Sequence, residues 1–393
     1  MPAMDHIVLV GASAAALTAA DALRLEGFTG TLTMVGEELR PPYDRPPLSK
    51  HVLSGKLEPH KTTLRQDADL QRLRMDLKLG CRATHLDPTA RTVTLDDGDR
   101  LHYDGLIIAT GLRPRRLPFG HDLAGVHVLR TLDEALSLRA QLLSAPRVVV
   151  IGAGFLGTEI AATTRGLGLD VALVDVEATP LARQLGPQIG GLVADMHQEH
   201  GVSLHLNRKV TGLTGTAGRV TAVQLDDGTS LPADLVVVAI GSEPAVDWLA
   251  DSGLPLGDGV LCDSTCQVVP GVYAAGDVAN WPHPLTGERA RLEQRTNATQ
   301  QALTAARNLL AGPAEAIPYA PVPFGWTDQY TAKIQFHGWC PMDARVAYVD
   351  GDPQDGKFVA LYYAGDRVVG ALGWNSARTL RAYHDRIAAP VAA

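Results

Sequence analysis

Short, largely apolar runs recur along the chain and predict buried β-strands. They cover residues 7–10, 31–35, 105–109, 147–151, 171–174, 235–240 and 271–277. Most are continuously apolar, which is typical of strands buried on both faces of a parallel sheet. An Ala- and Leu-rich segment, 14–24, predicts a helix after the first strand, and 291–310 predicts another. Strands that alternate with helices indicate an α/β fold.

The same pattern occurs twice in the chain. One copy runs from Val8 to Gly111 and the other from Val148 to Gly241. Each copy begins with a strand and a Gly- or Ala-rich turn, and each ends with an Asp-Asp-Gly hairpin and a buried strand that stops at Gly. Two such units predict two Rossmann-type dinucleotide-binding domains. A protein that binds two dinucleotides usually passes electrons between them.

The remaining segments suggest how these units are arranged. Four prolines between residues 41 and 50 should hold that segment extended. The strand at 271–277 has no phosphate loop of its own, so the second unit looks inserted into the first. We therefore expect a first dinucleotide-binding domain formed by residues 1–112 and 243–320, and a second formed by residues 113–242. A C-terminal α+β domain should cover 321–393, with strands at 359–363 and 368–372 and a basic helix at its end.

The second phosphate loop is complete, with Gly152, Gly154 and Gly157. These glycines allow a tight turn, close approach of a pyrophosphate and packing of the helix on the strand. Asp175 follows the next strand at nearly the spacing of about 20 residues expected for the acid that binds a ribose. A carboxylate there repels a 2′-phosphate, which favours NADH over NADPH.

The first loop departs from this pattern. Gly11 is followed by Ser13 and Ala16 where the second loop has glycines. Ala is an accepted variant at the third position, and a Ser hydroxyl can donate to phosphate. Glu37 then stands where an acid would bind the ribose of the first dinucleotide.

Composition and charge narrow the class of protein. The chain has 35 Lys and Arg against 43 Asp and Glu, a net charge of −8, and only 5% aromatic residues. This balance argues against a nucleic-acid partner. The four cysteines are too few for a disulfide scaffold and have no spacing that suggests a metal site. No run reaches the ~18–20 apolar residues of a membrane span, and no signal peptide is evident, so we expect a cytoplasmic protein.

Several motifs together resemble one family. They are YDRPPLSK (43–50), VIGAGFLGTEIAA (150–162), VYAAGDVA (272–279) and WTDQY (326–330). The chain resembles the FAD-containing, NADH-dependent ferredoxin reductases that serve bacterial cytochromes P450 and Rieske-type dioxygenases. The resemblance implies a glutathione-reductase-like fold, with FAD in the first domain and NADH in the second. It also implies hydride transfer from NADH to FAD, followed by single-electron transfer to a [2Fe–2S] ferredoxin. We expect a monomer or a weak dimer.

The resemblance also implies roles for individual residues. Lys50 would lie near the flavin N5, paired with Glu159, and Trp326 would lie by the flavin edge. The further residues expected to bind the two cofactors are Ala15, Arg45, Ala83, Thr110, Gly111, Arg130, Leu156, Arg183, Gly241 and Asp277. Arg295 stands where relatives carry an uncharged residue near the flavin. Ferredoxin docking needs a local basic patch, and the candidates are Arg113, Arg115 and Arg116, or Arg378, Arg381 and Arg386.

Three other functions stay open at this point. A disulfide reductase would need a redox cysteine early in the first unit, but no cysteine precedes Cys81. An NADH oxidase or a peroxide-reducing flavoenzyme would share the same fold. A flavin-binding protein whose associations respond to its redox state would also fit the two dinucleotide sites.

Overall fold

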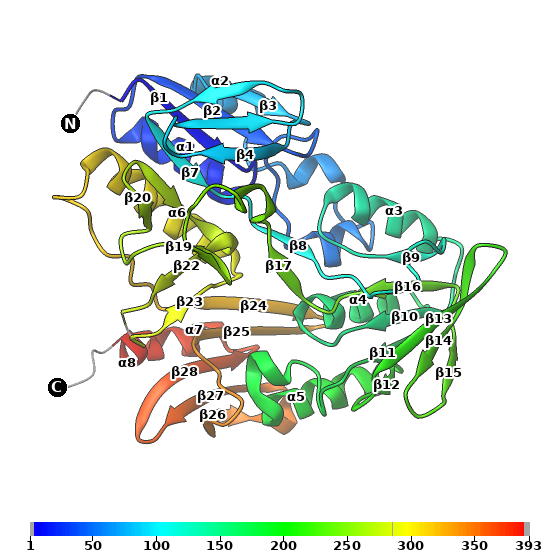
Figure 1. Ribbon diagram of the computed structural model, residues 1–393. Helices are drawn as coiled ribbons and strands as arrows, with labels where there is room; N and C mark the ends of the chain where they lie inside the picture. The colour runs from blue at the N-terminus through cyan, green and yellow to red at the C-terminus, as the bar shows by residue number, and fades with distance from the viewer. Residues whose placement is uncertain (1–3, 285, 389–393) are drawn as a thin grey trace.

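The computed structural model describes residues 4–284 and 286–388 and contains three main sheets (Figure 1). The first sheet has the strand order β20-β21-β7-β1-β2-β3. Its strands are β1 (His6–Val10), β2 (Thr31–Gly36), β3 (Asp76–Leu79), β7 (Gly105–Ile108), β20 (Gln267–Val269) and β21 (Val272–Ala274). All pairs are parallel except β20–β21. The predicted strands at 7–10, 31–35 and 105–109 and the predicted helix at 14–24 are confirmed.

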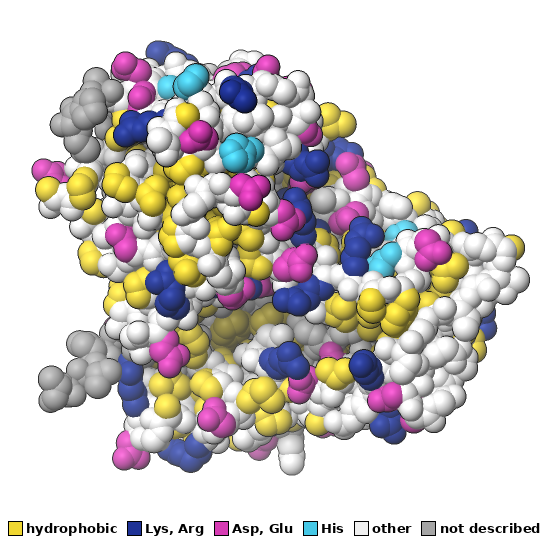
Figure 2. Space-filling view, in the orientation of Figure 1, with side chains coloured by type: hydrophobic (Ala, Val, Ile, Leu, Met, Phe, Trp, Pro, Cys, Tyr) yellow, Lys and Arg dark blue, Asp and Glu magenta, His cyan; other side chains and the backbone are white. Residues whose placement is uncertain are grey.

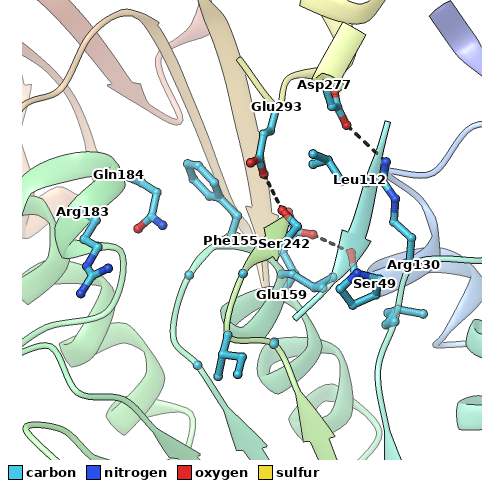
Figure 3. Close-up of a pocket in the computed structure, with 18 of the residues that line it drawn as sticks. Ser49, Leu112, Arg130, Phe155, Glu159, Arg183, Gln184, Ser242, Asp277 and Glu293 are labelled. Carbon is cyan, nitrogen blue, oxygen red and sulfur yellow. Dashed lines mark hydrogen bonds and ion pairs between the residues drawn. The ribbon is translucent and has the colours of Figure 1, made fainter. Parts of the chain in front are cut away.

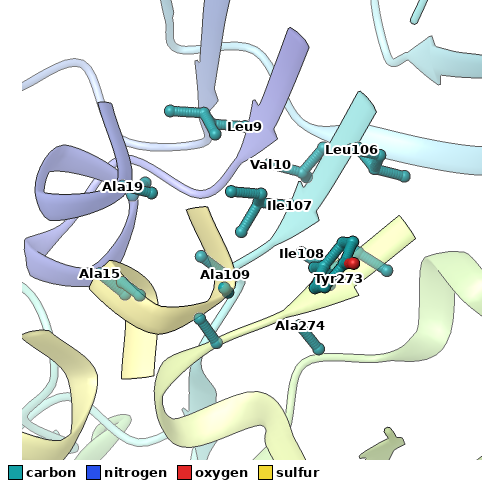
Figure 4. Close-up of a cluster of buried hydrophobic side chains, with 14 of the residues drawn as sticks. Leu9, Val10, Ala15, Ala19, Leu106, Ile107, Ile108, Ala109, Tyr273 and Ala274 are labelled. Atoms are coloured by element: carbon teal, nitrogen blue, oxygen red, sulfur yellow. The ribbon is translucent and has the colours of Figure 1, made fainter. Parts of the chain in front are cut away.

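Two helices cover the first sheet, α1 (Ala14–Leu25) and α6 (Arg295–Ala311), and they pack against each other. Ala15 and Ala19 of α1 belong to the same buried cluster as the strand residues Leu9, Ile107 and Ala274 (Figure 4). Small side chains on α1 let this helix pack closely on the sheet. The helix begins shortly after β1 ends, so its first turn lies just beyond the carboxyl end of that strand. The start of α1 is therefore held in place by the largest buried apolar cluster of the described residues.

The second sheet repeats this arrangement in the order β12-β11-β10-β16-β9, with all pairs parallel. Its strands are β9 (Val126–His127), β10 (Val148–Ile151), β11 (Val171–Val174), β12 (Ser203–His205) and β16 (Leu235–Val238). Its helices are α3 (Leu132–Leu142), α4 (Phe155–Gly166) and α5 (Ala182–Glu199). The predicted strands at 147–151, 171–174 and 235–240 lie here. Their continuous apolar character reflects helices or other strands on both faces.

The third sheet is antiparallel and lies near the C-terminus, in the order β24-β25-β28-β27-β26. Its strands are β24 (Phe324–Gln329), β25 (Ala332–Gly338), β26 (Arg345–Asp352), β27 (Lys357–Ala364) and β28 (Arg367–Trp374), followed by α7 (Ala377–Leu380) and α8 (His384–Ala388). One face packs on α5 through Leu185, Ile189, Phe336 and Tyr362. The C-terminal sheet thus rests on a helix of the second sheet's layer.

Shorter elements complete the chain. They are α2 (Asp67–Arg72), the hairpin sheet β4 (Ala83–Asp87), β5 (Thr92–Leu95) and β6 (Arg100–His102), the sheet β13 (Val210–Thr216), β14 (Arg219–Leu225) and β15 (Ser230–Pro232), the pair β8 (Leu112–Pro114) and β17 (Ser242–Pro244), and the sheet β18 (Leu256–Gly257), β19 (Gly259–Leu261), β22 (Ala279–Pro282) and β23 (Arg289–Ala290). The hairpin predicted around Asp96, Asp97 and Gly98 is β5–β6.

The chain leaves the first sheet after β7 and returns to it with β20 and β21, of which β21 pairs with β7. On the way out and back it forms β8 and β17, which pair with each other (Figure 1). We propose that the domain boundaries follow this route, with residues 113–242 inserted between 1–112 and 243–320, and 321–393 as the third domain.

Two predicted segments differ from the structure. Beyond Pro47 the proline-rich segment is not extended, because Pro47 has helical dihedral angles (φ −71°, ψ −15°) and Leu48–Val52 forms one π-helical turn, η1. Proline is tolerated in a first helical turn, where its missing N–H has no partner to bind. Helix α6 begins at Arg295 and not at Arg291, since Arg291 is bound to Asp258 and Glu293.

Within the described ranges, no helix is long and apolar enough to cross a membrane.

Candidate functional site

A cavity of about 1410 Å³ lies between the three sheets. Figure 2 shows it as a hollow in the middle of one face, with apolar side chains inside and charged side chains around its rim. It exceeds the ~300–1,000 Å³ of an ordinary small-molecule site. The carboxyl end of β10 and the N-termini of α1 and α4 open into it. Helix N-termini carry free N–H groups and positive potential, so the cavity has two places suited to phosphate.

The first loop is shaped by Gly11, whose φ is +122°. A Cβ at this position would lie 2.2 Å from the carbonyl oxygen of Ala109, so only glycine allows the loop to pass β7. Ser13 is the N-cap residue of α1, and its hydroxyl makes no capping hydrogen bond. Ser13, Ala14 and Ala15 line the cavity. The Ser hydroxyl is thus left available to a group bound at this helix terminus.

The second loop has the same construction. Gly152 has a φ of +103°, and a Cβ there would lie 2.3 Å from the carbonyl oxygen of Ala239. A Cβ at Gly157 would lie 1.8 Å from the carbonyl oxygen of Gly152, so the helix can pack this closely only with glycine. Asp175 fixes the loop from the neighbouring strand, because one carboxylate oxygen accepts from the Ala153 N–H and the other from the Glu177 N–H at 2.8 Å.

Lys50 and Glu159 form a buried ion pair beside the cavity. Lys50 Nζ lies 2.7 Å from Glu159 Oε2, and the two side chains are 11% and 8% exposed. The π-helical turn that carries Lys50 packs on α4, where the Thr163 hydroxyl donates to the Ser49 carbonyl at 2.8 Å. Ser49 also donates from its own hydroxyl to Glu159 Oε2 at 2.5 Å (Figure 3). The predicted pairing of Lys50 with Glu159 is therefore present in the structure.

A second charged cluster lies on the side of the first sheet. Arg130 Nη2 lies 3.3 Å from Asp277 Oδ2 (Figure 3). Burial raises the pKa of the Asp277 carboxyl above its ordinary value, and the Arg130 guanidinium opposes this shift. Arg45 donates to the Arg130 carbonyl at 2.6 Å and to Glu38 at 2.7 Å. This places two guanidinium groups along one wall of the cavity.

The residues present fit a bound FAD. Arg45 Nε and Gln294 Oε1 are buried and find no hydrogen-bond partner among the described residues, and both side chains line the cavity. Buried polar atoms rarely stay unpaired in a complete structure. A donor and an acceptor left open at the cavity wall suit the polar groups of a dinucleotide.

The predicted site residues divide into two groups. Those that line the cavity are Ser13, Ala15, Arg45, Gly111, Arg130, Gly152, Gly154, Leu156, Glu159, Asp175, Arg183, Gly241 and Asp277. Those that do not line it are Gly11, Ala16, Glu37, Lys50, Ala83, Thr110, Gly157 and Trp326. Gly11, Ala16 and Gly157 act through close packing, and the Thr110 hydroxyl donates to the Ala245 carbonyl at 2.9 Å. Trp326 stacks on Phe324 with ring centroids 6.0 Å apart, and the C-terminal tryptophan at the cavity is Trp339.

Several cavity residues were missed from the sequence. Glu177 lies two residues after Asp175 and pairs with Arg183 at 2.6 Å. Phe155, Gln184 and Trp339 also line the cavity, and Phe155 stacks on Phe336 of the C-terminal sheet at 5.8 Å. A second acid after the ribose-binding position could have been noticed. The aromatic contacts join distant segments, so no local pattern announces them.

Arg295 lines the cavity as well, at the start of α6. Its Nε donates to Asp44 Oδ1 at 2.6 Å, and its Nη1 donates to the Thr299 hydroxyl. The charge of Arg295 is therefore balanced by a partner from the proline-rich segment.

Comparison with known proteins agrees with this geometry. Residues 5–302 match the pyridine nucleotide-disulphide oxidoreductase family, and residues 324–392 match the reductase C-terminal family. Rhodocoxin reductase from Rhodococcus erythropolis is 37% identical over 374 residues, which cover 95% of this chain and 87% of that protein.

Two solved structures are also similar. The ferredoxin reductase for the CYP199A2 system from Rhodopseudomonas palustris has a TM-score of 0.91 and 34% identity, and covers 95% of this chain and 92% of its own. The covalent putidaredoxin reductase–putidaredoxin complex has a TM-score of 0.91 and 32% identity, with 97% and 93% covered. The chain therefore belongs to the pyridine nucleotide-disulphide oxidoreductase family, among its ferredoxin reductases.

Proposed function

We propose that the cavity holds FAD at the α1 terminus and NADH at the α4 terminus, and that the chain passes electrons from NADH to a [2Fe–2S] ferredoxin of a P450 or dioxygenase system. The observation that carries this is the opening of two phosphate-binding helix termini into one cavity, with Glu159 of the Lys50 pair lining it. The names of the similar reductases support the same reaction.

When bound, FAD supplies a carrier that takes two electrons together and releases them one at a time. Ser13 and the free N–H groups of α1 would hold its pyrophosphate, and Arg45, Arg130 and Asp277 would hold its polar groups. Lys50, oriented by its ion pair with Glu159, would supply a cation near the flavin N5. Glu37 is exposed and stays a candidate for the ribose, as Trp326 stays a candidate for the flavin edge and Ala83 for a cofactor contact.

Two carboxylates favour NADH over NADPH. Asp175 and Glu177 both line the second phosphate site. The nearby Arg183 is paired with Glu177 at 2.6 Å, and Arg208 is paired with Asp227 at 2.6 Å, so an acid offsets the charge of each guanidinium near this site. A carboxylate accepts hydrogen bonds from ribose hydroxyls and repels added phosphate.

A disulfide reductase finds no support in the cavity. All four cysteines are described, and of these Cys340 is the one that lines the cavity. Burial raises the pKa of its thiol to about 12, which keeps the sulfur protonated. A reactive cysteine needs a thiolate.

The test is stopped-flow reduction of the purified holoenzyme, followed at flavin wavelengths, with NADH and NADPH in parallel. We expect rapid bleaching by NADH, much slower bleaching by NADPH, and reoxidation by an added [2Fe–2S] ferredoxin. Reoxidation by oxygen at the same rate would favour an NADH oxidase instead. A flavin that neither nucleotide reduces would refute the proposal.

The docking surface has two candidates in different settings. Arg113 is paired with Asp247, Arg115 donates to the Ser242 carbonyl at 3.1 Å, and Arg116 follows them near the cavity. Arg378, Arg381 and Arg386 are exposed near the C-terminus and take part in no ion pair with the described residues. Acidic ferredoxins would be attracted to either cluster.

Charge reversal separates the two clusters. We expect Arg381→Glu or Arg116→Glu to raise the KM for ferredoxin several-fold, with NADH oxidation by ferricyanide unchanged as the control. Equal loss of both activities would reject a docking role for the cluster concerned. A cytoplasmic location and a monomeric or weakly dimeric state stay predictions.

A further inference from the structure

A continuous chain of buried polar side chains leads from the Lys50–Glu159 pair into the C-terminal sheet. Thr327 and Gln329 of β24 and His197 of α5 are buried, with at most 1% of their surface exposed. Thr327 donates from its hydroxyl to Glu159 Oε1 at 2.8 Å, and Gln329 Nε2 donates to the Thr327 hydroxyl oxygen at 3.1 Å. Glu159 therefore has one oxygen facing Lys50 and Ser49 and the other facing Thr327.

The chain continues to the surface of the molecule. Gln329 Oε1 lies 2.9 Å from His197 Nε2, and His197 Nδ1 lies 3.1 Å from the Tyr330 hydroxyl. Tyr330 stacks on the exposed ring of His200, with centroids 3.6 Å apart. Because an amide oxygen only accepts, His197 Nε2 carries the proton and Nδ1 accepts from Tyr330. Burial lowers the pKa of His197 to about 4, so its ring is neutral and can make both bonds.

All four bonds in this chain run in the same direction. Tyr330 donates to His197, His197 to Gln329, Gln329 to Thr327, and Thr327 to Glu159. Hydrogen bonds aligned in this way polarise one another, and the last acceptor is a buried carboxylate, whose negative charge is stabilised by donors. The chain does not conduct protons, because the Gln329 nitrogen only donates and its oxygen only accepts.

We propose that Tyr330, His197, Gln329 and Thr327 form a one-directional donor chain that stabilises the charge of Glu159 and fixes its orientation toward Lys50. Thr327 and Gln329 are then positioning residues for hydride transfer. The proposal rests on the proposed function, because it assigns Lys50 to the flavin N5.

Gln329 also connects this chain to the nucleotide loop. Its second N–H donates to the Thr158 hydroxyl oxygen at 2.9 Å, and the Thr158 hydroxyl donates to the Gly154 carbonyl at 2.9 Å. One amide group thus holds both Glu159, through Thr327, and the start of α4, where NADH would bind. The C-terminal sheet contributes to the site through these two bonds without Thr327 or Gln329 lining the cavity.

The main test compares Thr327→Val with Thr327→Ser in the holoenzyme. Loss of a hydrogen bond to a charged group predicts a flavin reduction rate at saturating NADH about tenfold lower in Thr327→Val, and close to normal in Thr327→Ser. The midpoint potential of the flavin should fall by about 30 mV in Thr327→Val, the equivalent of a tenfold change for a two-electron couple. The Kd for NADH should stay unchanged. Gln329→Leu should act in the same direction, and Tyr330→Phe more weakly.

Thr164→Val is the matched control. Thr164 is buried in the same helix as Glu159, but its hydroxyl has no hydrogen-bond partner among the described residues. We expect normal rate and potential in this variant. If Thr327→Val behaves like Thr164→Val, or only loses thermal stability or flavin content while rate and potential per bound flavin stay normal, the donor chain is refuted. If the unaltered enzyme is not reduced by NADH, it is the proposed function that fails.

Discussion

At the scale of single residues, Asp175 supports the fold and is also the proposed partner of the NADH ribose. Its two oxygens accept from the Ala153 and Glu177 N–H groups, so it holds the second glycine loop against β11. Each carboxylate oxygen accepts more than one hydrogen bond, which leaves capacity for a ribose. Replacing Asp175 therefore changes the loop and the nucleotide preference together.

We expect Asp175→Ala to lower kcat/KM for NADH by about 10- to 100-fold, the range that corresponds to losing a hydrogen bond to a charged group. NADPH should lose less, because the negative charge that repels its 2′-phosphate is removed as well. The measurement is kcat/KM for both nucleotides with ferricyanide as acceptor. An Asp175→Asn variant separates charge from loop support, since it keeps one acceptor oxygen. Equal losses for NADH and NADPH would show that Asp175 supports only the loop.

Two threonines of α4 provide a stability prediction with opposite signs. Thr158 and Thr164 are both fully buried. The Thr158 hydroxyl donates to the Gly154 carbonyl and accepts from Gln329, whereas the Thr164 hydroxyl has no partner among the described residues. Thr164→Val should therefore leave the free energy of unfolding unchanged or raise it by up to about 1 kcal/mol, and Thr158→Val should lower it by about 1–3 kcal/mol. Urea unfolding of both variants measures this; the same shift in both would contradict it.

At the scale of elements, the sequence predicts best where the pattern is local. Strands β1, β7, β10 and β21 are short apolar runs, and the loops after β1 and β10 need glycine for reasons of backbone space. The π-helical turn at Leu48–Val52 was not predicted, because packing on α4 selects it over the extended form that the prolines favour. Helix α5 and its kink were not predicted, although the kink lies at Gly186 (φ 76°, ψ 160°), directly before Pro187, a residue that interrupts helices.

A hydrogen bond beside this kink gives a prediction for α5. The Tyr362 hydroxyl of β27 donates at 2.7 Å to the carbonyl of Leu185, the residue before Gly186. Tyr362→Phe removes this buried hydrogen bond, so the free energy of unfolding should fall by about 1–2 kcal/mol. Tyr363→Phe is the control, because no hydrogen bond of its hydroxyl is found within the described residues. Equal chemical unfolding midpoints for the two variants would show that the Tyr362 bond contributes nothing.

At the scale of the whole molecule, the site is built where three sheets meet. The sequence could place the parts that belong to one module, such as Gly152, Asp175 and Asp277. It could not place the parts that belong to contacts between modules. Trp339, which follows β25, lines the cavity, and His197 of α5 contacts Gln329 of β24. Such contacts depend on how the C-terminal sheet rests on α5, and no periodicity in the chain encodes that placement.

The same interface predicts how stability depends on pH. His197 is fully buried, and burial lowers its pKa from 6.5 to about 4. Between these values the unfolded chain binds a proton that the folded state excludes, so stability is complete above about pH 6.5 and is lost as the pH falls toward 4. At about 1.4 kcal/mol for each pKa unit, the loss amounts to about 3 kcal/mol at pH 4.

The His197→Asn variant should be less stable than the unaltered protein at pH 7, and its free energy of unfolding should depend less on pH between 6.5 and 4. Some dependence should remain, because burial also lowers the pKa of His337 to about 4. The free energy of unfolding at pH 7, 6, 5 and 4.5 for both proteins measures this, and parallel curves would show that His197 does not carry the effect.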